Sequence, residues 1–239
     1  MDLLERARAR SWYHTIELTD DYVTPGWFDL RPFVEHYGLP ADMSGMRALE
    51  VGTWDGFWAF EMERRGAEVV AIDLDHERDL DWPPRRRPSV WSDERRGDGF
   101  RLAKEILGSK VERIDMSVYN ATPEELGTFD FVFCGTVLLH LRDQLLALER
   151  IANLCTNRFV SAEEYDRLAS LVPFPVSRYY ADRDKAVVFW LPAIRTWERM
   201  VRTAGFDRVV RHSKFVMVAS GGVKVPHVVL HADKVAAAS

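Results

Sequence analysis

Cysteine and long apolar runs are both scarce in this chain of 239 residues. It has two cysteines, Cys134 and Cys155, and neither stands at a spacing typical of zinc ligands. We therefore expect no metal site and two reduced, buried thiols, as in a cytoplasmic protein. No apolar stretch approaches the length of a membrane span, and the N-terminal MDLLERARAR lacks the apolar core of a signal peptide. These features predict a cytoplasmic protein without a membrane partner.

An excess of positive charge is also missing. The chain has 32 Lys and Arg against 37 Asp and Glu, a net charge of −5. No global basic field is present to hold a polyanion, and local runs such as 85–87 and 95–96 are more typical of solvated faces. We therefore expect a small-molecule partner rather than nucleic acid. The sequence does not determine the oligomeric state.

From residue 46 onward, strand-like and helix-like segments alternate. This alternation predicts an α/β domain with a parallel sheet and right-handed crossovers, closed by a β-hairpin at Gly221-Gly222. Asp55 and Thr122 are expected N-caps, the latter in a capping box with Glu125, and Pro192 is expected in the first turn of the last helix. The expected strands are 46–52, 68–74, 110–117, 129–135, 158–165, 206–218 and 225–233, and the expected helices are 2–10, 56–65, 99–109, 143–154 and 191–205.

Residues 1–45 are rich in aromatic side chains and are interrupted by proline and glycine, so they do not fit a regular sheet. We assign them to an N-terminal cap on a domain of residues 46–239, within a single domain overall. The aromatic residues of the cap, Trp27 among them, have two possible roles. They pack the cap onto the main domain, or they roof a ligand cleft.

The stretch ALEVGTWDGFW, residues 48–58, is the most informative one. Glu50 is an acid near the end of a predicted buried strand, which is costly unless a partner bonds to it. A dinucleotide fingerprint G-x-G-x-x-G starting at Gly52 would need glycine where Trp54 and Phe57 stand, which disfavours that motif. The alternative pattern is acid-x-Gly-x-Gly-x-Gly followed by an acid at the end of the next strand, here Asp73.

That second pattern resembles class I S-adenosylmethionine (SAM)-dependent methyltransferases, with Trp54 in place of the middle glycine. IDM at 114–116 and GTFDFVFCGTVLLHLRD at 127–143 resemble later parts of the same family. Together with WYH, TPGWFD and LLH, they are similar to a subgroup related to the tRNA wobble-uridine carboxymethyl-transferases and their small bacterial paralogues. Those tRNA enzymes carry Tyr-His where this chain has Leu139-His140, so ordinary SAM is the expected cofactor.

The resemblance implies a Rossmann-like, mostly parallel seven-stranded sheet with a C-terminal antiparallel hairpin strand and an N-terminal helical and aromatic cap. It places Glu50 near the amino group of SAM, Asp73 at the ribose hydroxyls and Asp115 at the adenine amine, with Leu74 and Met116 on either side of the ring. Asp75 is the alternative to Asp73. The implied cofactor residues are Glu50, Gly52, Thr53, Trp54, Gly56, Asp73, Leu74, Asp115, Met116 and Gly135.

Methyl transfer to an oxygen or a protonated amine needs a base. His140 is the first candidate because it follows the fourth strand at the ligand-binding edge, and it could equally be a packing histidine. His14 with Tyr13, from the cap, is the second. The candidate substrate-binding residues are Trp27, Glu163, Tyr165, Arg178 and Tyr179, the last two in an irregular segment, 166–188, that could form a lid.

Three functions remain open on the sequence. The first is SAM-dependent O- or N-methylation of a small molecule, in natural-product or other secondary metabolism. The second is a tRNA-modifying methyl- or carboxymethyl-transferase, suggested by the subgroup and the arginine runs. The third is a SAM-binding protein that has lost methyl transfer, a cyclase or a binding module, suggested by Trp54 in the cofactor loop.

Overall fold

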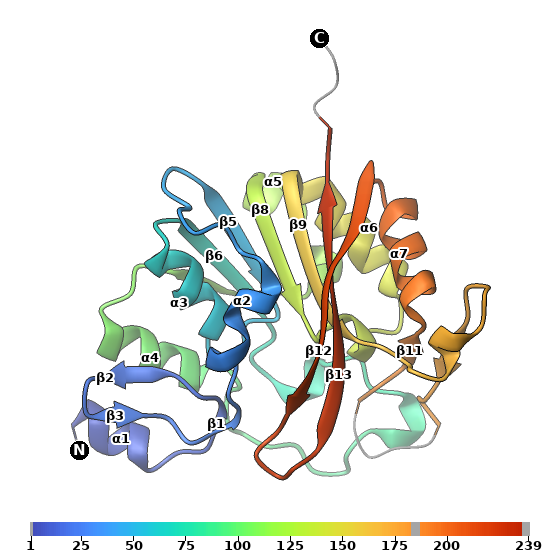
Figure 1. Cartoon of the computed structure of the whole chain (residues 1–239). Helices are drawn as coiled ribbons and strands as arrows, with labels where there is room; N and C mark the ends of the chain where they lie inside the picture. Colours follow the sequence, from blue (N-terminus) through green and yellow to red (C-terminus); the bar gives the residue numbers. More distant parts are fainter. Residues whose placement is uncertain (1, 183–186, 236–239) are drawn as a thin grey trace.

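A seven-stranded sheet forms the centre of the computed structural model, which describes residues 2–182 and 187–235 (Figure 1). Its strand order is β12-β13-β9-β8-β5-β6-β7. Only β13 runs antiparallel to its neighbours in this sheet, so the prediction of a mostly parallel sheet with one antiparallel hairpin strand is confirmed. The strands are β5 (Arg47–Val51), β6 (Glu68–Asp73), β7 (Glu112–Asp115), β8 (Phe129–Gly135), β9 (Cys155–Glu164), β12 (Arg208–Val218) and β13 (Lys224–Asp233).

Helices cover both faces of the sheet, because alternate strand residues point to opposite faces and both sets are apolar. In β8, Phe131 and Phe133 join one core cluster, whereas Val132 and Cys134 join the other. The first cluster includes residues of α3 and α4, and the second includes residues of α6 and α7. The helices are α3 (Phe57–Arg64), α4 (Asp98–Leu107), α5 (Pro123–Leu126), α6 (Gln144–Leu154) and α7 (Ile194–Thr203).

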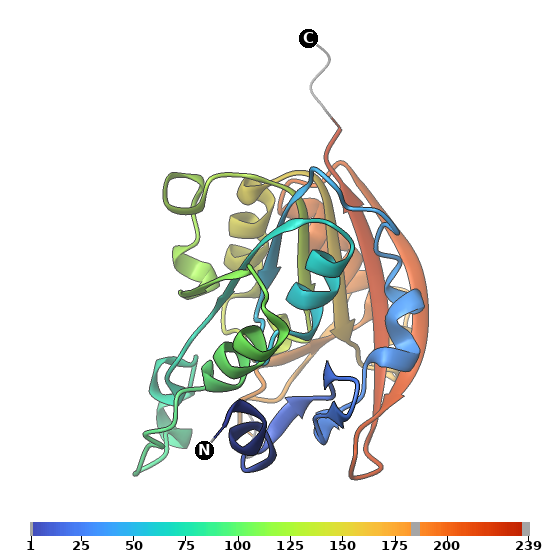
Figure 2. The same cartoon turned by 90° about the vertical axis from the view of Figure 1, so that its left-hand side faces the viewer.

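The N-terminal segment lies below the carboxyl ends of the parallel strands, in the lower part of Figure 1. Its α2 packs on β12, where Phe33 stacks on Phe215 with ring centroids 5.2 Å apart. Figure 2 shows this blue helix against the hairpin of β12 and β13. The elements of the segment are α1 (Leu3–Arg8), β1 (Trp12–His14), β2 (Glu17–Thr19), β3 (Tyr22–Val23), β4 (Gly26–Phe28) and α2 (Val34–Tyr37), and the strands form two small two-stranded ladders.

Two local predictions about helix starts are wrong, and a third holds only in part. The N-cap of α3 is Gly56 and makes no side-chain bond, because the Asp55 carboxylate binds the N-terminal segment instead. Thr122 is the N-cap of α5, but it makes no side-chain cap bond, so there is no capping box with Glu125. Pro192 ends a short strand, β11 (Trp190–Pro192), that pairs with β10 (Ser177–Tyr179), and α7 begins after it.

The segment expected to be irregular, 166–188, therefore contains a strand, and its residues 183–186 lie outside the described part of the chain. The division into a cap of residues 1–45 and a domain of residues 46–239 stays a prediction. Within the described ranges, none of the helices has the length and apolar character needed to cross a membrane.

Candidate active site

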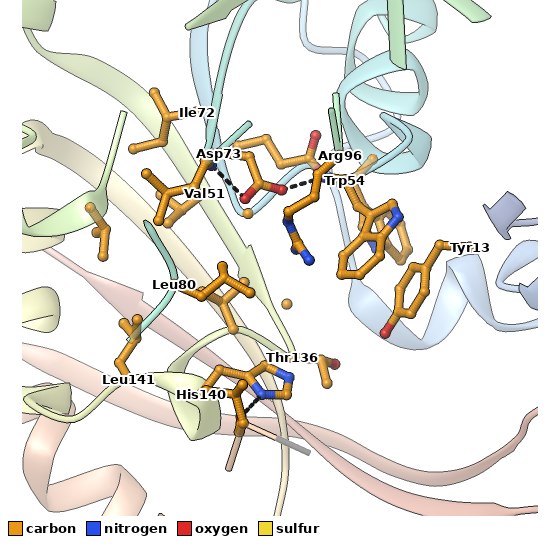
Figure 3. Close-up of a pocket in the computed structure, with 18 of the residues that line it drawn as sticks. Tyr13, Val51, Trp54, Ile72, Asp73, Leu80, Arg96, Thr136, His140 and Leu141 are labelled. Atoms are coloured by element: carbon orange, nitrogen blue, oxygen red, sulfur yellow. Dashed lines mark hydrogen bonds between the residues drawn. The ribbon is translucent and has the colours of Figure 1, made fainter. Parts of the chain in front are cut away.

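A cavity of about 460 Å³ lies at the carboxyl ends of β5, β6 and β8 (Figure 3). The N-terminal segment, the connection between β6 and α4, residues 116–119 after β7 and the hairpin of β12 and β13 supply further parts of its wall. This is the edge at which open α/β sheets bind ligands. It brings together the predicted residues Tyr13, His14, Glu50, Gly52, Trp54, Asp73, Leu74, Met116, Gly135 and His140.

Glu50 is a buried carboxyl group at the wall of this cavity, only 1% exposed. Its Oε2 accepts a hydrogen bond from the Thr53 hydroxyl at 2.6 Å. Burial raises the pKa of Glu50 to about 8, and the bond from Thr53 opposes this shift. Thr53 itself is fully buried and does not line the cavity, so it orients Glu50 rather than facing a ligand.

The loop after β5 is tied to the end of β6. The Asp73 Oδ2 accepts the Trp54 N–H at 2.8 Å, and its Oδ1 accepts the Leu74 N–H at 2.7 Å. Gly52 has a φ of 80°, and a Cβ there would lie 2.2 Å from Val137 Cγ2. Glycine is therefore required both by the backbone conformation and by the loop that follows β8.

Asp73, and not its neighbour Asp75, faces the cavity. Asp75 is 3% exposed and forms ion pairs with Arg113, at 2.6 Å, and with Arg101. Those pairs commit its carboxylate to the interior beside α4. Each Asp73 oxygen accepts one hydrogen bond from a backbone N–H and keeps a further lone pair, so this carboxylate can still accept hydrogen bonds from two hydroxyl groups.

Besides Thr53, two further predicted cofactor residues lie outside the cavity lining. Gly56 has a φ of 95°, and a Cβ there would lie 2.6 Å from both Phe100 and Phe60. Its missing side chain allows α3 to pack on α4, and its assignment to the cofactor stays a prediction. Asp115 is exposed, and its Oδ1 accepts the Asp75 N–H at 2.9 Å. The cavity is lined instead by the residues that follow it, 116–119.

Trp54 connects the loop after β5, here called the cofactor-type loop (residues 52–56), to the N-terminal segment. Its ring stacks on Tyr13 with centroids 4.3 Å apart, and the guanidinium carbon of Arg96 lies 3.8 Å from the ring centroid. Figure 3 shows Tyr13 and Arg96 on either side of this ring. Asp55, 1% exposed, fixes the same contact because its Oδ2 accepts the Tyr13 N–H at 2.6 Å and the His14 N–H at 3.1 Å. Trp54 thus shapes the cavity and also holds the cap.

His140 faces the cavity from the turn after β8 (Figure 3). Its Nδ1 contacts the carbonyl oxygen of Val187, and a carbonyl oxygen can only accept a hydrogen bond. The proton of the neutral ring is therefore on Nδ1, and Nε2 keeps its lone pair. Burial lowers the pKa of His140, which keeps the ring neutral. This tautomer suits a group that accepts a proton.

His14 and Tyr13 are neutral at the other side of the cavity. Burial lowers the pKa of His14 to about 3, and its Nδ1 has no hydrogen-bond partner. Burial raises the pKa of Tyr13 to about 12, against the opposing charge of Arg96. Tyr13 can therefore donate a hydrogen bond near pH 7 but cannot act as a phenolate base.

A hydroxyl–histidine pair in the wall was not expected from the sequence. Thr136 Oγ1 lies 3.1 Å from His227 Nε2, and His227 Nδ1 lies 3.0 Å from the Val225 carbonyl oxygen. The carbonyl fixes the proton on Nδ1, so the Thr136 hydroxyl donates to Nε2. Thr136 also has a φ of 55°, a conformation rare for β-branched residues. His227 interrupts the apolar run VPHVVL, and this interruption was the available sequence signal.

The five candidate substrate residues do not line the cavity: Trp27, Glu163, Tyr165, Arg178 and Tyr179. Trp27 is 46% exposed and lies against the hairpin turn at Gly221. Arg178 forms an ion pair with Asp166 at 2.7 Å, and Tyr179 is exposed beside Trp190. Tyr165 packs against the core on the α6 face. As direct acceptor ligands they remain a prediction without support from this geometry.

Glu163 has a different place, beneath the loop that carries His140. It is 2% exposed, and its Oε1 accepts the N–H groups of Val137 and Leu138, each at 3.3 Å. Burial raises its pKa to about 8. The carboxyl group therefore positions the loop after β8 rather than a substrate.

Residues 27–212 match a family of proteins described as a methyltransferase domain. The chain belongs to this family. No group of three or more potential metal ligands occurs among the residues that the structure describes.

Two curated relatives are similar over part of their length. One is a tRNA U34 carboxymethyltransferase of Pseudomonas paraeruginosa, 27% identical over 175 residues that make up 69% of this chain and 46% of the relative. The other is a ubiquinone biosynthesis O-methyltransferase of Xanthomonas euvesicatoria pv. vesicatoria, 28% identical over 51% of this chain and 43% of the relative. The chain thus spans less than half the length of either relative.

Solved structures share the fold. The N-terminal domain of EvdMO1, crystallised with SAH and D-fucose, has a TM-score of 0.65 at 17% identity and matches 98% of each chain. Magnesium protoporphyrin IX methyltransferase from Synechocystis PCC 6803, with bound SAH, has a TM-score of 0.54 at 14% identity, over 81% of this chain and 76% of that one. At these identities the likeness establishes the fold, and it agrees with the seven-stranded sheet described above.

Proposed function

We propose that this protein is a SAM-dependent methyltransferase that acts on a small-molecule acceptor. The observation that carries the proposal is the Asp73 carboxylate, held beside the Gly52–Trp54 loop and facing the same cavity as Glu50. Membership of the methyltransferase domain family supports it, as do fold relatives that hold SAH. The cavity volume, about 460 Å³, falls within the range of small-molecule sites.

The residues present fit this cofactor. Asp73 has two lone pairs left for the ribose hydroxyls, and Glu50 is a buried carboxyl that a charged amino group would stabilise in its ionised form. Leu74, Met116 and Val118 give the cavity an apolar end suited to adenine. When bound, SAM would supply a methyl group from its sulfonium to the acceptor, and the thioether SAH would be the leaving group. The protein contributes positioning and exclusion of water.

His140 is the proposed base. Its neutral ring has Nε2 free to accept a proton from an acceptor hydroxyl or ammonium as the methyl group is transferred. His14 with Tyr13 is the second candidate for this step, on the side of the cavity formed by the N-terminal segment.

Calorimetric titration with SAH tests the proposal. We expect the wild type to bind SAH and Asp73→Ala to bind it more weakly by roughly 1–3 kcal/mol, through the lost hydroxyl bonds. Asp93→Ala, an exposed acid of the following connection, is the matched control and should bind like the wild type. No binding by the wild type at hundreds of micromolar would end the proposal.

A tRNA-modifying activity is the second candidate, favoured by the similarity to the tRNA U34 carboxymethyltransferase. Filter binding decides it. Retention of tRNA at moderate salt, weakened when Arg85 and Arg87 are both changed to glutamine, would support this alternative. Absence of binding would reject it.

The third alternative is a protein that binds SAM without transferring its methyl group. Accumulation of SAH with an acceptor present would reject it. A place in secondary metabolism and a cytoplasmic location also stay proposals. The two free, buried cysteines and the small-molecule neighbours support them.

A further inference from the structure

An unpaired guanidinium faces the cavity. Of the described residues that line it, Arg96 is the one arginine or lysine. Its Nε is buried without a hydrogen-bond partner, and Arg96 forms no ion pair with any carboxylate of the described ranges. The side chain is half-buried, and its charge acts on the Asp55 carboxyl, which already accepts two backbone N–H groups. Burying part of a cation without an ion-pair partner is costly, so this arrangement points to an anion supplied by a ligand.

The Arg96 side chain is held ready for such a ligand. Its backbone N–H donates to the Asp75 carbonyl oxygen at 2.8 Å, which returns the long connection after β6 to the edge of the cavity. The guanidinium then lies over the Trp54 ring at 3.8 Å, and Tyr13 supports that ring. A guanidinium fixed by its face leaves its edge free, and the edge is the part that binds a planar carboxylate with two parallel bonds.

Arg96 lies toward the N-terminal segment and His140 rather than toward Glu50. Burial has the largest effect on the pKa of Tyr13 and on that of His140, and the Arg96 charge acts on both. The charges that act on Glu50 are those of Asp73 and Arg113. SAM carries a carboxylate of its own, on the same carbon as the amino group assigned to Glu50. That carboxylate is therefore expected on the Glu50 side of the cavity rather than at Arg96.

The wall that includes the N-terminal segment is apolar and largely aromatic. It includes Phe28, Tyr37 and Trp58, with Tyr37 and Trp58 in ring contact at 4.2 Å. Such a wall suits a flat ring.

We propose that Arg96 binds a carboxylate of the methyl acceptor and that the acceptors are aromatic carboxylic acids. This inference rests on the proposed function and specifies its substrate class. Both the acceptor and the cofactor could offer a carboxylate, so the experiment separates these two sources.

The first arm is calorimetry on the full chain saturated with SAH. The probes are benzoate, 4-hydroxybenzoate and 3,4-dihydroxybenzoate, each against its neutral amide of the same shape. We expect at least one acid to bind the wild type about tenfold more tightly than its amide, because charge-assisted hydrogen bonds are about twice as strong as neutral ones. Arg96→Gln should reduce this preference to less than about threefold, and Arg95→Gln, at the exposed neighbouring position, should keep it.

The second arm compares SAH with 5′-methylthioadenosine, which lacks the amino-acid part. If Arg96→Gln binds both as the wild type does, the variant is folded and the anion comes from the acceptor. If Arg96→Gln weakens SAH alone, the guanidinium holds the cofactor's carboxylate and the inference is overturned. It is also overturned if the wild type prefers none of the acids over its amide. Failure of the wild type to bind SAH would instead contradict the proposed function itself.

Discussion

Changing Asp55 to alanine would remove the bond that fastens the N-terminal segment to the cofactor-type loop. One carboxylate oxygen accepts two backbone N–H groups, those of Tyr13 at 2.6 Å and of His14 at 3.1 Å. Alanine leaves both donors without this acceptor, in a place where Asp55 itself is 1% exposed. The Trp54 ring, which stacks on Tyr13, would lose its support on that side.

The expected cost follows from the two unsatisfied donors. Each buried donor without a partner costs about 1–3 kcal/mol, so Asp55→Ala should lower the free energy of unfolding by about 2–5 kcal/mol. Asp55→Asn keeps an acceptor oxygen of the same reach and should cost less than half as much. Asp20→Ala, an exposed acid of the same segment, should leave the free energy within about 0.5 kcal/mol of the wild type.

Urea-induced unfolding, followed by circular dichroism, measures these differences. Limited proteolysis gives an independent measurement, because a loosened N-terminal segment should be cut faster in Asp55→Ala than in Asp20→Ala. The reasoning fails if Asp55→Ala unfolds at the wild-type urea concentration and its N-terminal segment is cut at the wild-type rate. SAH titration then shows whether the altered segment also weakens cofactor binding.

Three further predictions concern the loops around the cavity. The folded pKa of Glu163, about 8, exceeds its ordinary value of 4.5, so the unfolded chain loses this proton first and the free energy of unfolding falls as pH rises between those values. Glu163→Gln should make that fall shallower by up to about 1.4 kcal/mol per pH unit. Equal slopes of the two proteins in urea titrations across this pH range would contradict this. His140→Asn should lower kcat by about 10²–10⁴ in a methyl-transfer assay while SAH affinity stays within about twofold; an unchanged kcat would exclude His140 as the base. Gly52→Ala should destabilise the fold by about 1–3 kcal/mol, measured by urea unfolding. Adding Val137→Ala should relieve the steric clash with the new Cβ but not the cost of the positive φ at residue 52. If the double variant recovered the wild-type stability in full, φ would not be a constraint there.

The sheet could be predicted because its signals are local. Runs such as EVVAIDL are apolar on both faces, as a covered parallel strand must be, and they recur between helical segments. The helix starts were less predictable because one side-chain acceptor can bind the first N–H groups of a helix or donors elsewhere in the fold. Asp55 precedes a helix in an N-cap pattern, yet its carboxylate binds two N–H groups far away in the chain, and the helix is left with Gly56.

The site could be predicted in part, where its signals are also local in the sequence. Glu50, Gly52 and Asp73 lie at strand ends whose spacing is set by one β/α unit, and the structure places all three at the cavity. Asp115 was expected there from the family resemblance, but its carboxylate accepts the Asp75 N–H and does not line the cavity. Trp27 was a candidate substrate residue of the cap, and the path of the N-terminal segment carries it to the hairpin turn.

The sequence alone determined the β/α order and the acidic loop of residues 48–58, because both depend on residues close together in the chain. Only the tertiary structure showed that Trp54 lies between Tyr13 and Arg96, and that Thr136 meets His227. Each of these contacts joins segments whose distance depends on how the chain passes around the sheet. Residue spacing does not encode the path of the chain around the sheet, yet that path decides which side chains face the acceptor.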